Sequence, residues 1–192
     1  AIVMSEASGN RFIHILATTG LGIIEESENQ LYQAAQLYQR VLDLVGDPNQ
    51  PIACAAYLGL ARIHYEWNDL ETAREYGEHG VRLAQQIESI DSAAGGMIFL
   101  ARLTLIQGDP AGAASILDEV EQVIVRGAFD KQRPVAAALR VLLFLHLGDM
   151  QSAAQLAWTY DVPLSQARIR MAQAKPVDAL DVVTSYERRM AA

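Results

Sequence analysis

A turn that recurs every 40 residues constrains this sequence more than any other feature. Each copy has a glycine or asparagine, an aspartate directly after it, and an alanine four residues further on. The three clear copies are Asn68-Asp69 with Ala73, Gly108-Asp109 with Ala113, and Gly148-Asp149 with Ala153. Weaker copies begin at Asn29 and Ala174. A unit of this length, present about five times, predicts an array in which each repeat packs on its neighbours.

The chemistry of the turn predicts that each repeat is a helix, a tight turn and a second helix. Glycine and asparagine adopt the left-handed conformation that ends a helix. The aspartate side chain can accept hydrogen bonds from the first N–H groups of the next helix. A single hairpin of this kind cannot bury its apolar face alone, so neighbours must stack. We therefore predict an all-α fold, a right-handed α-α superhelix of about five helical hairpins.

Apolar residues at helical spacing, interrupted by glycine and proline, place the hairpins along the chain. We predict repeats at about 5–46, 52–88, 91–127, 131–160 and 164–190, within one domain that spans 1–192. In the first helix of the first repeat, an apolar face is predicted from Phe12, Ile15, Leu16, Leu21, Ile23 and Ile24. The fifth repeat is expected to be abbreviated, because Asp161-Val162-Pro163 interrupts the pattern.

Glycines in the second and third repeats occupy positions where bulkier residues are usual. Gly77 and Gly80 lie in the second helix of repeat two, and Gly95 and Gly96 lie early in the next helix. These thin surfaces predict a close helix crossing between the two repeats. The alternative is that the glycines only weaken their helices, each by roughly 1 kcal/mol relative to alanine.

Composition excludes several classes of partner. The chain is 51% hydrophobic, which is sufficient for a large core, and its net charge is −8 with only two lysines, Lys131 and Lys175. This charge argues against direct contact with nucleic acid. A single cysteine, Cys54, rules out an intrachain disulfide framework and is typical of a reducing cytoplasm. No uncharged apolar run reaches 18 residues, so we expect a soluble cytoplasmic protein without a membrane partner.

Motifs that carry catalysis or bind cofactors are absent from the sequence. Neither lysine lies in a phosphate-binding loop, and no Gly-x-Ser-x-Gly occurs. The four histidines never show metal-ligand spacing, and His64 is expected to be a hydrogen-bonded core histidine. We therefore predict no catalytic residue, no metal, no cofactor and no enzymatic activity. A pair of carboxylates that assembles only in the folded chain remains the alternative.

A stripe of arginines is the strongest candidate for a binding site. Counting back eleven residues from Ala73, Ala113 and Ala179 reaches Arg62, Arg102 and Arg168. These positions lie on first helices, which line the concave surface in arrays of this kind. Tyr65 and Glu66 follow Arg62 by about one turn, so an aromatic face, a carboxylate and guanidinium groups could meet a polar ligand. We predict a ligand or partner site at Arg62, Tyr65, Glu66, Arg102 and Arg168; the alternative is that the arginines pair with glutamates of adjacent repeats.

One stretch also resembles a known family. Residues 59–73, Gly-Leu-Ala-Arg-Ile-His-Tyr-Glu-Trp-Asn-Asp-Leu-Glu-Thr-Ala, are similar to the tetratricopeptide-like sensor region of MalT-type, LuxR-family transcriptional regulators. Residues 167–179, Ala-Arg-Ile-Arg-Met-Ala-Gln-Ala-Lys-Pro-Val-Asp-Ala, and a period longer than the usual tetratricopeptide repeat point the same way.

This resemblance implies a function that the residues alone do not give. Members of the family are multidomain signal-transduction ATPases with a nucleotide-binding module, a helical sensor and a DNA-binding helix-turn-helix. The sensor binds a small-molecule inducer or a regulatory protein or peptide, and it contacts the other domains of the same regulator. We therefore expect this chain to be the sensor piece of a larger regulator. The alternative is a generic tetratricopeptide scaffold that docks a peptide without a small-molecule effector.

Overall fold

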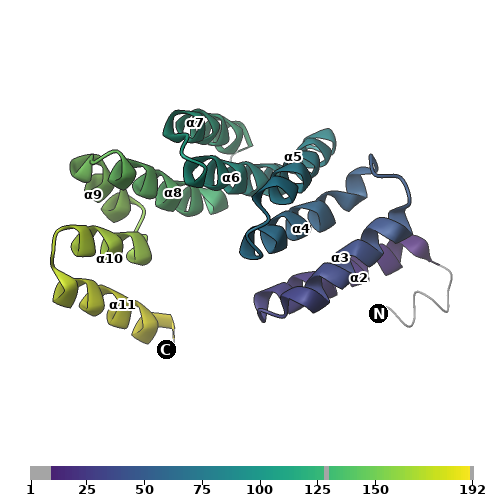
Figure 1. Cartoon of the computed structure of the whole chain (residues 1–192), viewed down its shortest axis with the longest axis horizontal. Coiled ribbons are helices and arrows are strands. Elements are labelled where there is room, and N and C mark those ends of the chain that lie inside the picture. Colours follow the sequence, from purple (N-terminus) through teal and green to yellow (C-terminus); the bar gives the residue numbers. More distant parts are fainter. Residues whose placement is uncertain (1–9, 128–129, 191–192) are drawn as a thin grey trace. The chain divides into compact units, whose positions relative to one another are not determined.

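A computed structural model describes residues 10–127 and 130–190 of this chain. The described residues form ten α-helices and two short 3-10 helices, Pro51–Ala53 and Asp130–Gln132, with no β-strand among them (Figure 1). The α-helices are α2 (Arg11–Ser27), α3 (Leu31–Val45), α4 (Cys54–Glu66), α5 (Leu70–Gln86), α6 (Ile90–Ile106), α7 (Pro110–Gly127), α8 (Arg133–His146), α9 (Met150–Thr159), α10 (Pro163–Ala172) and α11 (Pro176–Met190). The predicted all-α helical-repeat class is thus confirmed. The predicted start of the first repeat, residues 5–9, lies outside the described residues.

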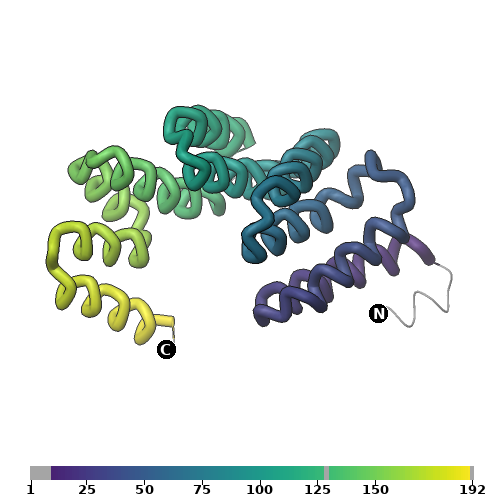
Figure 2. Tube along the Cα trace, viewed as in Figure 1, coloured from purple at the N-terminus to yellow at the C-terminus, as the bar shows by residue number. Residues whose placement is uncertain are grey.

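The chain divides into two units, Ala1–Leu103 and Thr104–Ala192, and the division falls within α6. In unit 1, α2 packs on α3 and α4 packs on α5; in unit 2, α8 packs on α9 and α10 packs on α11. Figure 2 traces these successive hairpins along the chain. The helices lie close to the predicted repeat ranges, and α10 has 10 residues whereas α4 has 13 and α8 has 14, as expected of an abbreviated repeat. That the repeats form one domain stays a prediction.

The recurring turns adopt the conformation that their residues predict. All five turn residues have a positive φ: 61° at Asn29, 60° at Asn68, 88° at Gly108, 78° at Gly148 and 58° at Ala174. The aspartates after three of them cap the next helix. Asp69 accepts a hydrogen bond from the backbone N–H of Thr72, Asp109 from that of Gly112, and Asp149 from that of Ser152. The turn therefore ends one helix and begins the next with residues that suit each task.

Small residues let the helices approach closely. The repeat alanines Ala34, Ala73, Ala113, Ala153 and Ala179 are all buried. The close crossing predicted from the glycines is confirmed in unit 1. A Cβ added at Gly77 would lie 2.9 Å from Cδ2 of Leu100, and one at Gly96 would lie 2.6 Å from Cγ2 of Val81, so these two glycines permit the crossing between repeats two and three. Gly80 instead faces Leu58 of its own repeat, which would lie 2.8 Å from an added Cβ.

The apolar face predicted for α2 is mostly exposed, which corrects the expectation that it would join the core. Ile15 is buried, whereas the other five predicted residues, Phe12, Leu16, Leu21, Ile23 and Ile24, are exposed. Unit 1 instead buries α2 through Ile15, His14, Thr18 and Gly22. Helical spacing identifies which side of a helix is apolar, but it does not say which neighbour covers that side.

No helix in the described ranges is both long and apolar enough to cross a lipid bilayer.

Candidate ligand-binding site

A hollow of about 300 Å³ opens on unit 1 beside the carboxyl-terminal halves of three first helices. Residues of α2, α3, α4 and α6 and of the turn between α2 and α3 line it: Glu26, Asn29, Leu31, Arg62, Ile63, Tyr65, Glu66, Phe99 and Arg102. Four of the five residues predicted as a ligand site, Arg62, Tyr65, Glu66 and Arg102, are among them. The fifth, Arg168, is exposed on α10 in unit 2 and is not one of the lining residues. That a ligand or partner contacts these residues stays a prediction.

The side of the hollow formed by α4 and α6 is aromatic. The rings of Tyr65 and Phe99 meet edge to face, with centroids 5.8 Å apart and planes at 82°. Such a pair is a favourable arrangement of aromatic quadrupoles and gives the wall a defined shape. Leu31, which is partly buried, adds aliphatic surface, and the fully buried Ile63 lies behind the wall. This wall can therefore pack against an apolar part of a small ligand.

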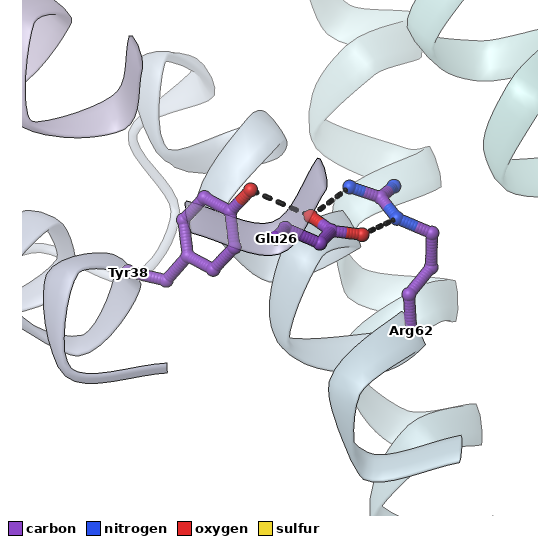
Figure 3. A network of polar contacts seen from close by, with 3 residues as sticks. All are labelled: Glu26, Tyr38 and Arg62. Atoms are coloured by element: carbon purple, nitrogen blue, oxygen red, sulfur yellow. Dashed lines mark hydrogen bonds and ion pairs between the residues drawn. The ribbon is translucent and has the colours of Figure 1, made fainter. Parts of the chain in front are cut away.

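Arg62 is held in place by a carboxylate on the neighbouring first helix (Figure 3). Its Nε donates to Oε1 of Glu26 at 2.5 Å and its Nη2 donates to Oε2 at 2.8 Å. The Arg62 side chain is 45% exposed, whereas that of Glu26 is 18% exposed. This two-point pairing fixes the plane of the guanidinium as well as its charge. For Arg62, the alternative of pairing with a glutamate of an adjacent repeat is therefore correct, although the residue still lines the hollow.

Tyr38 of α3 completes this network from within the core. Its hydroxyl donates to Oε2 of Glu26 at 2.7 Å, and the residue is fully buried. The ring fills space that two glycines leave open: a Cβ added at Gly22 of α2 would lie 2.7 Å from its Cε1, and one at Gly59 of α4 would overlap the ring. Burial, together with the Glu26 carboxylate, raises the pKa of the Tyr38 hydroxyl far above its usual value. The hydroxyl therefore remains a donor at any physiological pH.

Glu26 and Tyr38 belong to the site but were not predicted from the sequence. Glu26 lies 36 residues before Arg62, and pairing between repeats is set by how the helices stack, which spacing alone does not fix. A partial signal existed, because Gly22 and Gly59 flank a large aromatic residue on the helix between them. A tyrosine that requires two glycines has a buried ring, and a buried hydroxyl must find a partner.

Among the described residues, Arg102 and Glu66 differ from Arg62 in having no hydrogen-bond or ion-pair partner. Both side chains are exposed, and within the described part of the chain neither forms a hydrogen bond or an ion pair. The hollow therefore presents one guanidinium and one carboxylate that are available to a ligand. Glu26 and Arg62 neutralise each other beside them.

Neighbouring aromatic and imidazole side chains have structural partners. His64 is partly buried, its Nδ1 lies 3.0 Å from Oδ2 of Asp69, and its ring contacts Trp67 and Tyr76 edge to face. The predicted hydrogen bond of His64 is thus confirmed, whereas its side chain is 21% exposed and lies at the edge of the core rather than within it. Cys54 is buried, and burial raises the pKa of its thiol, which disfavours the reactive thiolate.

Unit 2 has a hollow of its own, of about 460 Å³. Residues mainly of the second helices α7 and α9 line it: Asp118, Glu121, Gln122, Val125, Arg140, Leu156 and Tyr160. Its arginine is already paired, since Arg140 Nη2 lies 2.8 Å from Oδ1 of Asp118. This hollow offers no unpaired cation among its lining residues, so it is the weaker candidate. Across residues 10–127 and 130–190, no group of three His, Cys, Asp or Glu side chains could hold a metal ion.

Comparison with known proteins agrees with the class that the fold and turns define, a tetratricopeptide-like helical repeat protein. The sequence profile of the MalT-like TPR region matches residues 1–189, and the chain belongs to this family. No curated protein matches the sequence.

Solved structures share the fold at low sequence identity. A protein of nearly identical TPR-like repeats from Podosopora anserina superposes with a TM-score of 0.64 at 16% identity, covering 93% of this chain and 95% of that one. A thermophilic TPR protein from Thermus thermophilus superposes with a TM-score of 0.66 at 18% identity, covering 89% of each chain. At such identities the likeness concerns the fold alone.

Proposed function

We propose that this chain is the effector-sensing and protein-interaction region of a LuxR-family transcriptional regulator of the MalT type, with the hollow of unit 1 as its effector site. The observation that carries the proposal is the family match over residues 1–189 in a chain in which four of the five predicted site residues line one hollow. The proposal assigns no catalysis, no cofactor, and no direct contact with nucleic acid or membrane to this chain. It places the chain in the cytoplasm, in contact with the other domains of the regulator.

The mechanism is differential binding. An effector in the hollow touches three successive first helices, through Glu66 on α4 and through Phe99 and Arg102 on α6, beside Glu26 at the end of α2. The bound effector therefore favours the stacking of repeats in which it can contact all of these helices at once. The regulatory effect can be no larger than the difference in the effector's affinity for the two states of the array.

A thermal-shift screen of the chain against oligosaccharides, amino acids, nucleotides and acidic peptides tests the effector site. A compound that binds only the folded state raises the unfolding temperature. We expect this shift to be lost in Arg102→Ala and in Glu66→Gln. Neither side chain has a structural partner in the described part of the chain, so each change removes ligand contacts alone. Arg62→Ala would be a poorer test, since it also leaves Glu26 without its cation.

Arg126→Ala is the matched control for this screen. Its guanidinium is exposed on α7 and donates to the carbonyl of Gln122 in the same helix. We expect this variant to respond to the compound as the unmodified chain does. A shift that survives both substitutions in the hollow would refute the assignment of the effector site.

A second candidate function is a scaffold that docks a partner peptide without a small-molecule effector. One observation favours it: Tyr32 and Trp67 form an exposed aromatic pair with ring centroids 5.1 Å apart, and they are 73% and 38% exposed. Exposed tyrosine and tryptophan are typical of protein docking surfaces. Selection of peptides from a display library on the immobilised chain tests this function. Peptides whose binding is lost in Tyr32→Ala but kept in Arg102→Ala would favour the scaffold.

A further inference from the structure

The charges around the hollow of unit 1 restrict which ligand it can hold. Two carboxylates, Glu26 and Glu66, and two guanidiniums, Arg62 and Arg102, line it, so their formal charges cancel. Glu26 and Arg62 are bound to each other in the two-point pair, and Glu26 also accepts the Tyr38 hydroxyl. One charge of each sign, Glu66 and Arg102, is left for a ligand to satisfy.

A ligand with only one sign of charge fits this arrangement poorly. An anion would pair with Arg102 but would displace water from Glu66 and meet its like charge. A cation would do the reverse. Leaving a charge desolvated and unpaired costs more than a neutral contact can return. A neutral polyhydroxyl compound can bond to both groups, but it compensates neither charge.

From this we propose, building on the effector function proposed above, that the hollow binds a small zwitterion, a free α-amino acid or a dipeptide. Its carboxylate pairs with the guanidinium of Arg102, which suits two-point binding of a planar carboxylate. Its ammonium group pairs with the carboxylate of Glu66. The Glu26–Arg62 pair forms the fixed wall beside them, and Tyr38 holds Glu26 in place from within the core.

Size and surface define the ligand further. A volume of about 300 Å³ lies at the low end of small-molecule sites, which run from about 300 to 1,000 Å³. The edge-to-face pair of Tyr65 and Phe99, with Leu31, offers apolar and aromatic surface to the ligand's side chain. The hollow therefore favours an apolar or aromatic amino acid, alone or in a dipeptide.

Isothermal titration calorimetry with the unmodified chain tests the proposal. The ligands are the twenty L-amino acids and the dipeptides Phe-Phe and Leu-Leu, and the tightest binder is then compared with its N-acetylated and C-amidated forms. We expect each capped form to bind about tenfold more weakly or worse, because each loses one charge-assisted interaction. The proposal is wrong if no amino acid or dipeptide binds, or if the capped forms bind as tightly as the parent.

Two variants test whether Glu66 binds the ligand's ammonium group and Arg102 its carboxylate. Glu66→Gln should bind the parent and the N-acetylated form equally, and Arg102→Gln should bind the parent and the amidated form equally. Arg126→Ala should keep both preferences. Unfolding midpoints of the variants verify that each is folded, and the capped ligands test the proposal on the unmodified chain in any case.

The same binding experiments distinguish a wrong ligand class from a wrong effector site. If an oligosaccharide binds, loses its affinity in Arg102→Ala and no zwitterion competes with it, the effector site stands and the ligand class proposed here is wrong. Loss of a capped-form preference in Arg126→Ala as well would contradict the assigned contacts.

Discussion

The hydroxyl of Tyr38 should stabilise unit 1 by holding Glu26 against Arg62. Tyr38→Phe deletes only this hydroxyl and keeps the ring between Gly22 and Gly59, so it creates no large cavity. A hydrogen bond to a charged group contributes about 1.5–3 kcal/mol. Glu26 keeps its two bonds from Arg62 and is 18% exposed, so water partly replaces the lost donor. We therefore expect the free energy of unfolding to fall by about 1–2 kcal/mol, at or below the lower end of that range.

Urea unfolding with a tryptophan reporter in each unit measures this effect. Trp67 lies in unit 1 and Trp158 in unit 2. Trp158→Phe leaves Trp67 as the reporter, and Trp67→Phe leaves Trp158. In a stacked array each helical repeat contacts only the repeats next to it, so a change in unit 1 has its main effect there. We therefore expect the larger shift in the unfolding transition that Trp67 reports.

Tyr32→Phe is the matched control, because it removes a hydroxyl from a tyrosine that is 73% exposed. It should change the free energy of unfolding by no more than about 0.5 kcal/mol. A double-mutant cycle with Glu26→Ala should return a coupling of about 1 kcal/mol. The reasoning is refuted if Tyr38→Phe costs no more than the control, because the buried hydroxyl would then contribute nothing beyond the ring.

Three further changes test the fold. Gly59→Ala should cost about 1–3 kcal/mol by urea unfolding, since its Cβ would overlap the Tyr38 ring, whereas Gly20→Ala, with no atom within 4 Å of its Cβ, should be neutral or stabilising by up to about 1 kcal/mol. Hydrogen bonds from Ser152 hold the pKa of the Asp149 carboxyl below its usual value. The Asp149 carboxylate therefore contributes fully to stability above its unfolded pKa of about 3.9, and this contribution is lost as the pH falls through its lower folded pKa. The unfolding midpoint of Asp149→Asn should depend less on pH in this acid range than that of the unmodified chain. Ala174→Gly should raise the thermal midpoint, stabilising by up to about 1 kcal/mol, because φ is 58° at this alanine; an unchanged or lower midpoint would count against strain there.

Local chemistry explains why so much of the fold was predictable from the sequence. A left-handed residue followed by an aspartate ends one helix and starts another whatever the rest of the chain does. All five predicted turns therefore occur, even where alanine takes the left-handed position at residue 174. Four of the five predicted site residues line one hollow because matched repeat positions on α4 and α6 lie on the same face of the stack.

Pairing between helices was harder to predict, because it depends on the third dimension. The contact of Glu26 with Arg62 follows from how α2 stacks beside α4, and the buried Tyr38 hydroxyl follows from two glycines on different helices. The exposed face of α2 has the same origin, since an apolar stripe predicts burial only when a neighbour covers it. The role of Arg168 in ligand binding stays a prediction, as it lies in the other unit.

The location of ligand binding is the most direct test of the central claim, that the hollow of unit 1 is the effector site. Backbone amide chemical shifts of the chain should be followed while the tightest compound from the thermal-shift screen is added. We predict that the largest changes fall at residues 26–31, 62–66 and 99–102, and that they vanish in Arg102→Ala. Largest changes at Asp118, Arg140 and Tyr160 in the hollow of unit 2, or at Tyr32 and Trp67 with none around Arg102, would contradict the account.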